Sequence, residues 1–238
     1  VEDFTVDEND FFNKHFEGRY VMIGILGSGG SSTTYRARRK DGAGDSSERV
    51  IKHARTEADF ERLKKEYRVL DEIKEKTFSS AKELIEDPSP GVLILSYIPG
   101  ITLKEFFRDD LEFNQILDIF ELAINQLAIV HRHGWVHGDI QPMNLIVNDS
   151  PELSVSLIDF GSAVKIGESL KQPRTPKTCA PEMLKDLPKT EKSDIYSLAA
   201  TFINLILERP HRKLNASDFN ESFELMGLTD LDEAKFSE

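Results

Sequence analysis

The sequence predicts an α+β fold in which an antiparallel, strand-rich first part with one helix precedes a mainly helical second part. Before a Pro99-Gly100 turn, short β-branched and apolar runs alternate with glycine-rich turns, which is the pattern of an antiparallel meander. After that turn, apolar residues recur mostly at helical spacing. We therefore place a boundary between the two parts at Pro99-Gly100.

The first part is expected to contain an extension, four strands and one helix. Residues 1–18 are acidic with scattered Phe, and we expect them either to dock through those Phe residues or to stay loose. Strands are predicted for RYVMIGILG (19–27), TTYRARRK (33–40), RVIKHA (49–54) and GVLILSYIPG (91–100). Between the last two, Phe60, Leu63, Tyr67 and Leu70 are spaced as on one helix face, so residues 59–74 are expected to be helical.

The second part is expected to contain two long helices with short strands between them. A wide apolar stripe runs from Phe113 to Val130, and Gly134 is a suitable end for that helix. The runs LIV (145–147) and VSLIDF (155–160) are interpreted as strands. The run SDIYSLAATFINLILE (193–208) predicts a buried helix with Ser193 or Asp194 as its N-cap.

Composition restricts the class of protein. The chain has 238 residues, of which 39% are hydrophobic and 30% charged, as in a soluble globular protein. Its net charge of −12 argues against nucleic acid or an anionic membrane as the main partner, and the basic run 36–40 is interpreted as a solvated rim. The single cysteine, Cys179, fits a reducing, cytoplasmic location. The apolar run LAATFINLIL is too short to span a bilayer, so no membrane partner is expected.

Several residues carry chemistry that local structure alone does not require. The run LGSGGSSTTY (26–35) lies between two predicted strands, where glycines let a backbone hairpin approach a phosphate, although such turns are also common without a ligand. Lys52 lies in the middle of an apolar strand, and the next helix offers Glu66. A buried lysine paired with a helix glutamate would hold a diphosphate at a fixed point.

The run WVHGDIQPMNLIV (135–147) places Asp139 and Asn144 on one loop, and LIDFG (157–161) adds Asp159. Amide and carboxylate oxygens are hard ligands, so Asn144 and Asp159 suit Mg²⁺ completed by water and substrate phosphates. Asp139 is then left to accept a proton from an attacking hydroxyl. His137 lies among apolar neighbours and is expected to be a packed core residue.

Together and in this order, these motifs resemble the catalytic domain of Hanks-type (eukaryotic-like) serine/threonine protein kinases, with an HGD-type catalytic loop and a bacterial flavour. The resemblance runs from Ile25 to Leu207. The matching motifs are the glycine-rich loop LGSGGSSTTYRAR, the strand VIK, the helix KKEYRVL, the hinge LSYIPGITL, the loop HGDIQPMN, the magnesium motif DFG, the segment TPKTCAPE and the helix KSDIYSLA.

The resemblance implies a bilobal protein-kinase-like fold that uses ATP and Mg²⁺ to phosphorylate Ser/Thr hydroxyls of protein substrates. Residues 1–18 would be an N-terminal extension, 19–99 the N-lobe and hinge, and 100–238 a C-lobe that is truncated or reduced after the KSDIYSLA helix. The sequence leaves the oligomeric state open.

The resemblance also implies roles for individual residues. Asp139 would be the catalytic base, Thr175 would touch it, Glu66 would position Lys52 on the phosphates, and Gln141 would stand where a lysine is usual. Asn144 and Asp159 would hold magnesium. Leu70, His137 and Phe160 would stack as an internal spine. The implied nucleotide-binding residues are Leu26, Gly27, Ser28, Gly29, Gly30, Thr34, Val50, Lys52, Leu95 (the gatekeeper), Ser96, Tyr97, Ile98 and Ile146.

The sequence departs from the family pattern at functional positions. Gly138 replaces an arginine that reads a phosphate on the activation segment, so we expect that phosphorylation of this segment is not the switch. Gln141 replaces a lysine that neutralises the transferring phosphoryl group, and loss of such a contact costs roughly a hundred- to thousandfold in rate. The glycine loop ends in Ser31-Ser32. Glu182 is expected to be unpaired or to use Arg209 or Arg212.

Two other functions remain open. A small-molecule phosphotransferase of the aminoglycoside- or choline-kinase kind shares the HGD and IDF spelling, but it lacks the TPKTCAPE segment and the aspartate of the KSDIYSLA helix. A pseudokinase that binds a nucleotide or a partner is suggested by Gln141 and the altered glycine loop. Against the pseudokinase, Lys52, Glu66, Asp139, Asn144 and Asp159 are all present.

Overall fold

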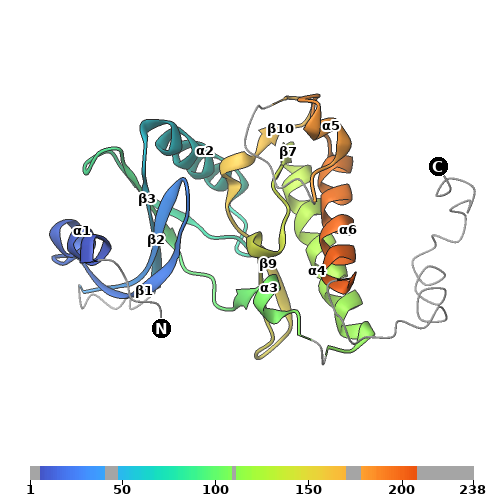
Figure 1. Ribbon diagram of the computed structural model, residues 1–238, viewed down its shortest axis with the longest axis horizontal. Coiled ribbons are helices and arrows are strands. Elements are labelled where there is room, and N and C mark those ends of the chain that lie inside the picture. Colours follow the sequence, from blue (N-terminus) through green and yellow to red (C-terminus); the bar gives the residue numbers. More distant parts are fainter. Residues whose placement is uncertain (1–5, 41–47, 109–110, 170–177, 208–238) are drawn as a thin grey trace, which may run out of the picture.

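The computed structural model describes residues 6–40, 48–108, 111–169 and 178–207, which form two lobes (Figure 1). The first lobe is an antiparallel sheet with helices on its faces, and the second is mainly helical. The predicted α+β class is therefore confirmed.

The N-lobe sheet has five strands in the order β1-β2-β3-β5-β4, all antiparallel neighbours. Alternating burial along β2 and β3 shows why the β-branched runs form strands, since successive side chains face opposite layers. Lys52 pairs with Thr34 on one side and Leu93 on the other, so it sits at the centre of the sheet. The strands are β1 (Tyr20–Ser28), β2 (Ser32–Arg39), β3 (Glu48–Ala54), β4 (Ala81–Ile85) and β5 (Val92–Ser96).

One face of this sheet is covered by α2 (Glu57–Ile73), as the apolar periodicity predicted. The helix begins after Thr56, whose side chain accepts a hydrogen bond from the Asp59 backbone N–H, and it ends at Lys74 in a left-handed conformation. Its buried face carries Phe60, Leu63, Glu66, Val69, Leu70 and Ile73. Glu66 is thus held inside an otherwise apolar face.

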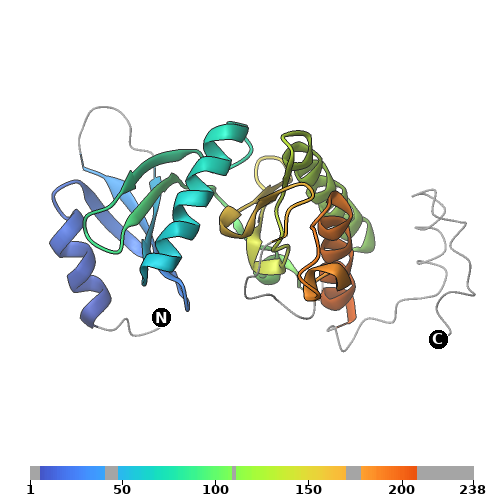
Figure 2. The same ribbon diagram turned by 90° about the horizontal axis from the view of Figure 1, so that it is seen from above.

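The opposite face of the sheet is covered by α1 (Val6–Phe16), so the sheet lies between two helices (Figure 2). Phe12 and Phe16 are buried against Tyr20 and Tyr35, in a hydrophobic cluster separate from the main core. The expectation that the extension docks through Phe residues is correct for this helix.

The C-lobe is built on α4 (Phe113–Arg132) and α6 (Glu191–Leu207), which pack side by side (Figure 1). Two small sheets lie between them and the N-lobe, with strand orders β6-β8-β9 and β10-β7. The remaining elements are β6 (Ile101–Thr102), α3 (Leu103–Phe106), β7 (Trp135–Val136), η1 (Pro142–Asn144), β8 (Leu145–Asn148), β9 (Ser154–Leu157), η2 (Phe160–Ser162), β10 (Val164–Lys165) and α5 (Pro181–Leu184).

Two statements from the sequence need correction. Helix α6 begins at Glu191, so neither Ser193 nor Asp194 is its N-cap; Ser193 lies inside the first turn, where its Oγ accepts from the Thr190 N–H at 3.1 Å. The sequence also gave no strand at β4, because the charged residues Lys82 and Glu83 interrupt its apolar alternation.

The sequence analysis tested only the run LAATFINLIL against the length of a bilayer and left out a longer apolar helix. Helix α4 has 20 residues, and an 18-residue window of it has a mean hydropathy of 1.2, which by length and composition alone would suffice to cross a membrane. Its residues Ile116, Ile119, Ala123, Leu127 and Val130 are instead buried in the main hydrophobic core, against β9 and α6. We therefore describe α4 as the core helix of the C-lobe.

Candidate active site

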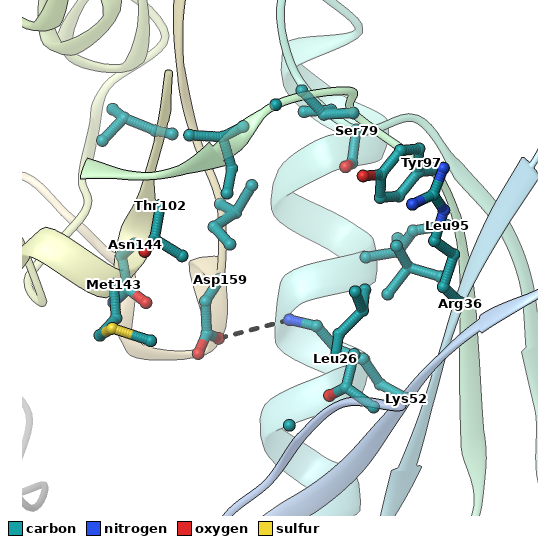
Figure 3. A pocket seen from close by; sticks show the side chains of 18 of the residues that line it. Leu26, Arg36, Lys52, Ser79, Leu95, Tyr97, Thr102, Met143, Asn144 and Asp159 are labelled. Carbon is teal, nitrogen blue, oxygen red and sulfur yellow. Dashed lines mark ion pairs between the residues drawn. The ribbon is translucent and has the colours of Figure 1, made fainter. Parts of the chain in front are cut away.

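A cleft of about 430 Å³ opens between the lobes and is lined from both of them (Figure 3). From the N-lobe come the predicted site residues Leu26, Gly27, Thr34, Val50, Lys52, Glu66 and Leu95. From the hinge and C-lobe come Tyr97, Ile98, Asn144, Ile146 and Asp159. The fold thus gathers residues that lie far apart in the sequence around one cavity.

A chain of charges crosses this cleft. Lys52 Nζ lies 2.8 Å from both carboxylate oxygens of Glu66 and 3.6 Å from Asp159 Oδ1. The Lys52 and Glu66 side chains are only 12% and 1% exposed, whereas that of Asp159 is 49% exposed. One carboxylate is therefore committed to holding the lysine, while the other faces the open cleft (Figure 3).

Electrostatics favour the charged forms of the cleft pair. Burial opposes the charge on Lys52, but the facing carboxylates of Asp159 and Glu66 outweigh it and raise the pKa of Lys52. The ammonium in turn lowers the pKa of Asp159. Lys52 therefore stays a cation at neutral pH and suits an anionic ligand. Asp159 stays an anion and suits a metal cation.

The catalytic-loop candidates form a second cluster, centred on Asp139. Its Oδ2 accepts from Gln141 Nε2 at 3.0 Å and from Asn144 Nδ2 at 3.1 Å, and Asn144 Nδ2 also donates to the Asp139 carbonyl at 2.9 Å. Since the amide nitrogen of Asn144 is used in this way, its oxygen is the atom left to bind a cation. Burial raises the pKa of Asp139, and the charge of Asp159 adds to the rise.

The backbone of this loop is held by Asp194 of α6, whose side chain is fully buried. The carboxylate accepts from the backbone N–H groups of His137 at 2.8 Å and Gly138 at 2.9 Å, and contacts His131 Nε2 at 2.9 Å. The loop's geometry is therefore set by a helix that lies more than fifty positions later in the chain.

His137 is a buried core residue, as expected, and its ring packs on Phe160 with centroids 4.9 Å apart. Phe160 also contacts Phe78 at 5.4 Å, an aromatic neighbour that the sequence did not indicate. Leu70 is buried in the same core and lines the cleft beside Phe160. Just before Phe160, Asp159 has a φ of 64°, an uncommon value for a residue other than glycine. This turn aims its carboxylate into the cleft.

Of the hinge residues predicted to bind the nucleotide, Tyr97 and Ile98 line the cleft and Ser96 does not. Ser96 does not line the cleft: its carbonyl accepts from Ser79 Oγ at 3.1 Å and its N–H donates to Ser80. The Tyr97 N–H donates to the Glu48 carbonyl. Ile98 lines the cleft, and its backbone takes part in none of the hydrogen bonds between described residues.

The glycine loop is only partly in the cleft. Gly27 lines it, whereas Ser28, Gly29 and Gly30 do not. The Gly29 N–H is already bonded to the Ser32 carbonyl at 3.0 Å, and Ser28 Oγ accepts from Arg55 at 2.7 Å. An added Cβ at Gly27, Gly29 or Gly30 would meet nothing within 4 Å. Protein packing therefore does not require these glycines.

The remaining predicted residues lie outside the main cleft. Asp139 lines a small neighbouring depression with Gly138, Ile140, Thr178 and Cys179. Gln141 lies beside Asp139, and Thr175 is outside the described residues. The expected partners Arg209 and Arg212 of Glu182 are also outside the described residues. Within them, Glu182 accepts from Ser193 Oγ at 2.5 Å.

Some lining residues were missed by the sequence analysis, namely Arg36, Ser79, Thr102, Glu105 and Met143. Arg36 was interpreted as part of a solvated rim, but its guanidinium lies 4.2 Å from the Tyr97 ring centroid and donates to Glu48 at 2.6 Å. The sequence could have placed Arg36 at the cleft, because it is two positions after the predicted site residue Thr34 and side chains two apart on a strand share a face.

The donor set in the cleft fits magnesium and a nucleotide. No cluster of three or more His, Cys, Asp or Glu suited to a metal occurs within the part of the chain that the structure describes. Asp159 and Asn144 supply two hard oxygen ligands, and Mg²⁺ usually completes such a set with water and substrate phosphates. The apolar walls from Leu26, Val50, Leu95 and Ile146 suit a flat aromatic base.

Comparison with known proteins agrees with this geometry. A family profile described as "Protein kinase domain" matches residues 20–235. A probable serine/threonine-protein kinase of Clostridium acetobutylicum is 28% identical over 188 residues, covering 75% of this chain and 28% of the relative. Serine/threonine-protein kinase PrkC of Bacillus subtilis is 24% identical over 205 residues, covering 82% of this chain and 31% of PrkC.

A third relative is serine/threonine-protein kinase PknB of Mycolicibacterium smegmatis, 24% identical over 212 residues, covering 83% of this chain and 34% of PknB. The chain thus spans about a third of the length of each of these three relatives.

Proposed function

This chain belongs to the protein kinase domain family, and from that membership we propose that it transfers the γ-phosphoryl group of ATP to serine or threonine hydroxyls of protein substrates. The observation that carries the proposal is the unbroken charge chain Glu66–Lys52–Asp159 across the cleft, with Asp139 and Asn144 at its C-lobe side. A decayed site would have little reason to keep the buried Lys52–Glu66 pair in register with Asp159.

Residues of both lobes and of the hinge would bind and orient the nucleotide. Leu26, Val50, Leu95 and Ile146 form the apolar slot for the base, and Ile98 offers backbone groups to its edge. Lys52, held by Glu66, would contact the phosphates as a fixed cation. Asn144 and Asp159 would hold Mg²⁺, which when bound neutralises charge on the phosphates.

Asp139 would accept the proton of the attacking hydroxyl. The carboxylate is kept in place by Asn144 and Gln141 on one oxygen, which leaves its other oxygen for the substrate. No charged side chain stands at Gln141, so we propose that transfer is slow relative to a site with a lysine there. The choice of serine and threonine rests on the names of the relatives, and the bacterial, HGD-type character rests on PrkC, PknB and Gly138.

We propose that regulation does not depend on an arginine at the position of Gly138. Gly138 has no side chain with which to read a phosphate on the activation segment. We also propose a cytoplasmic location, which rests on the single cysteine Cys179 and on nothing else in the chain.

The pseudokinase alternative is supported by Gln141, and also by the Gly29 N–H, which is bonded within the loop rather than open to a phosphate. The small-molecule phosphotransferase alternative is supported by the HGD and IDF spelling alone. The buried Asp194, which fixes the backbone of His137 and Gly138, favours the protein kinase over the small-molecule enzyme, in which the aspartate of this helix is missing.

The test is transfer of label from γ-labelled ATP with Mg²⁺ to the protein itself and to generic Ser/Thr substrates, beside an Asp139→Asn variant. Label that appears with the wild type and disappears with the variant is the expected result. ATP binding without transfer to any protein would favour the pseudokinase, and transfer to a small alcohol alone would favour the small-molecule enzyme.

A further inference from the structure

A buried lysine, Lys189, lies beneath the catalytic loop, just before α6. Only 3% of the residue is exposed, and its Nζ donates to the Ser162 carbonyl at 3.4 Å. Burying an ammonium group is costly unless it does something for the fold or the site. Ser162 directly follows the DFG motif at 159–161, so the lysine touches the segment that places Asp159.

The same ammonium is one of three features that favour glycine at position 138, beside the backbone conformation and the Ser162 carbonyl. Gly138 has a φ of 75°, and a Cβ added there would lie 2.6 Å from Lys189 Nζ and 2.8 Å from the Ser162 carbonyl oxygen. Any side chain at 138 would therefore have to displace the lysine. In this fold, an arginine at 138 and Lys189 in its observed place exclude each other.

The backbone of Lys189 joins the same segments. Its N–H donates to the Glu168 carbonyl at 2.9 Å, and its own carbonyl accepts from the Gly167 N–H at 2.9 Å. Ser162 is also held from the other lobe, since Arg62 of α2 reaches its Oγ at 3.5 Å. Lys189 thus connects the catalytic loop, the residue after the DFG motif and the turn at 167–168.

We propose that Lys189 is a positioning residue for the kinase reaction: its buried ammonium replaces the cation missing at Gly138 and fixes the DFG segment against the catalytic loop. The proposal rests on the proposed function. Lys189 would keep Asp159 and Asp139 in register without a phosphate added to the protein. Neither the charge on Lys189 nor its contacts with Ser162 and Gly138 follow from the family motifs.

The experiment compares wild type, Lys189→Met and Lys185→Met as purified protein. Methionine keeps length and apolar bulk without charge, and Lys185 is an exposed lysine on the same segment. We expect Lys189→Met to lower kcat at least tenfold with the KM for ATP changed less than threefold, and Lys185→Met to match wild type. Phosphatase-treated wild type should keep its activity.

A rescue variant separates positioning from simple folding. In the conservative variant Lys189→Arg the cation is kept, so kcat should be at least threefold higher than that of Lys189→Met. If Lys189→Met does not fold, Lys189→Gln serves, because it removes the charge but keeps a polar group that can donate to the Ser162 carbonyl, and the same loss of kcat is expected. A kcat within twofold of wild type in the folded variant, or activity lost on phosphatase treatment, would overturn the proposal.

Magnesium-dependent nucleotide binding makes the two proposals distinguishable. If the wild type transfers no phosphate, the kinase proposal fails, but the placement of Asp159 by Lys189 can still be measured by titrating Mg²⁺ against bound fluorescent ATP. Lys189→Met should then need at least fivefold more Mg²⁺ than wild type or Lys185→Met. An unchanged Mg²⁺ requirement would count against Lys189 as a positioning residue whatever the outcome of the transfer assay.

Discussion

Gln141 donates from its Nε2 to Asp139 Oδ2 at 3.0 Å, and Asn144 donates to the same oxygen at 3.1 Å. Two neutral amides thus stabilise the candidate base, where the family resemblance leads one to expect an amide and an ammonium. Hydrogen bonds from neutral donors stabilise a carboxylate less than charged ones do. The site therefore keeps the geometry of the base, but position 141 itself carries no positive charge.

The first prediction concerns that missing charge. Gln141→Lys should raise kcat by roughly a hundredfold, because an ammonium there would neutralise charge on the transferring phosphoryl group. Gln141→Met, which has similar length but no donor, is the matched control and should be slower than wild type. Steady-state kinetics with a peptide substrate provides the measurement. Unchanged or lower activity in Gln141→Lys would show that another cation already supplies the charge.

The second prediction concerns pH. The base must be deprotonated, and burial raises the pKa of Asp139 above its ordinary 3.8, so kcat/KM should fall on the acid side at a pH above that value. The Gln141 hydrogen bond lowers the pKa of Asp139, so removing it in Gln141→Ala should move the acid limb to higher pH. A pH–rate profile of both proteins is the measurement. A limb that moves to lower pH in the variant would contradict this assignment of the base.

The third prediction concerns the Glu182–Ser193 contact. Ser193 is fully buried, and its Oγ donates to Glu182 at 2.5 Å while accepting from the Thr190 N–H at 3.1 Å. Ser193→Ala leaves the partly buried Glu182 carboxylate without this donor and should cost about 1–3 kcal/mol of stability. Thermal unfolding beside the exposed control Ser150→Ala provides the measurement. An unchanged melting temperature would mean that Glu182 is held by a group other than Ser193.

Short-range patterns were sufficient to predict most strands, the long helices and part of the lining of the cleft. Lys52 and Glu66 could be paired in advance because each lies in a recognisable local pattern, a strand and the helix after it. The contacts of Lys189 with Gly138 and Ser162, and of Ser193 with Glu182, could not be predicted in this way. Each depends on how a loop and a later helix meet in space, which no local periodicity records.

For the glycine loop, the local sequence pattern predicted more than the structure shows. Its sequence suggested a row of open N–H groups, yet the Gly29 N–H closes a turn onto the Ser32 carbonyl. A turn and a phosphate cradle need the same small, polar residues, so composition cannot distinguish the N–H groups bonded within the loop from those open to a ligand.

The fourth prediction concerns the N-terminal helix. Phe12 is 1% exposed, and its ring centroid lies 5.3 Å from that of Tyr35 on β2. Phe12→Ala should cost about 3–5 kcal/mol, because a buried aromatic ring is replaced by a cavity. Urea unfolding is the measurement, with the exposed Lys14→Ala on the same helix as control. A loss no greater than that of the control would show that α1 does not contribute to the N-lobe core.

The fifth prediction concerns His53, which joins α1 to the sheet. Its ring stacks on Phe11 with centroids 3.8 Å apart, and its Nε2 is a buried atom with no hydrogen-bond partner among the described residues. Burial, aided by the nearby cations His15 and Arg55, lowers the pKa of His53 to about 4. The folded protein therefore keeps this imidazole neutral at a pH where an exposed histidine is protonated.

The sign of the pH effect follows from this shift. Between pH 6.5 and about 4 the unfolded chain binds a proton at His53 that the folded chain does not, so this residue's contribution to stability is complete above 6.5 and is lost as the pH falls through that window. His53→Phe keeps an aromatic ring against Phe11 but cannot titrate. Urea unfolding at pH 5 and pH 7.5 should show a smaller loss on acidification for His53→Phe than for the wild type. An equal or larger loss in the variant would mean that His53 is not a source of the acid sensitivity.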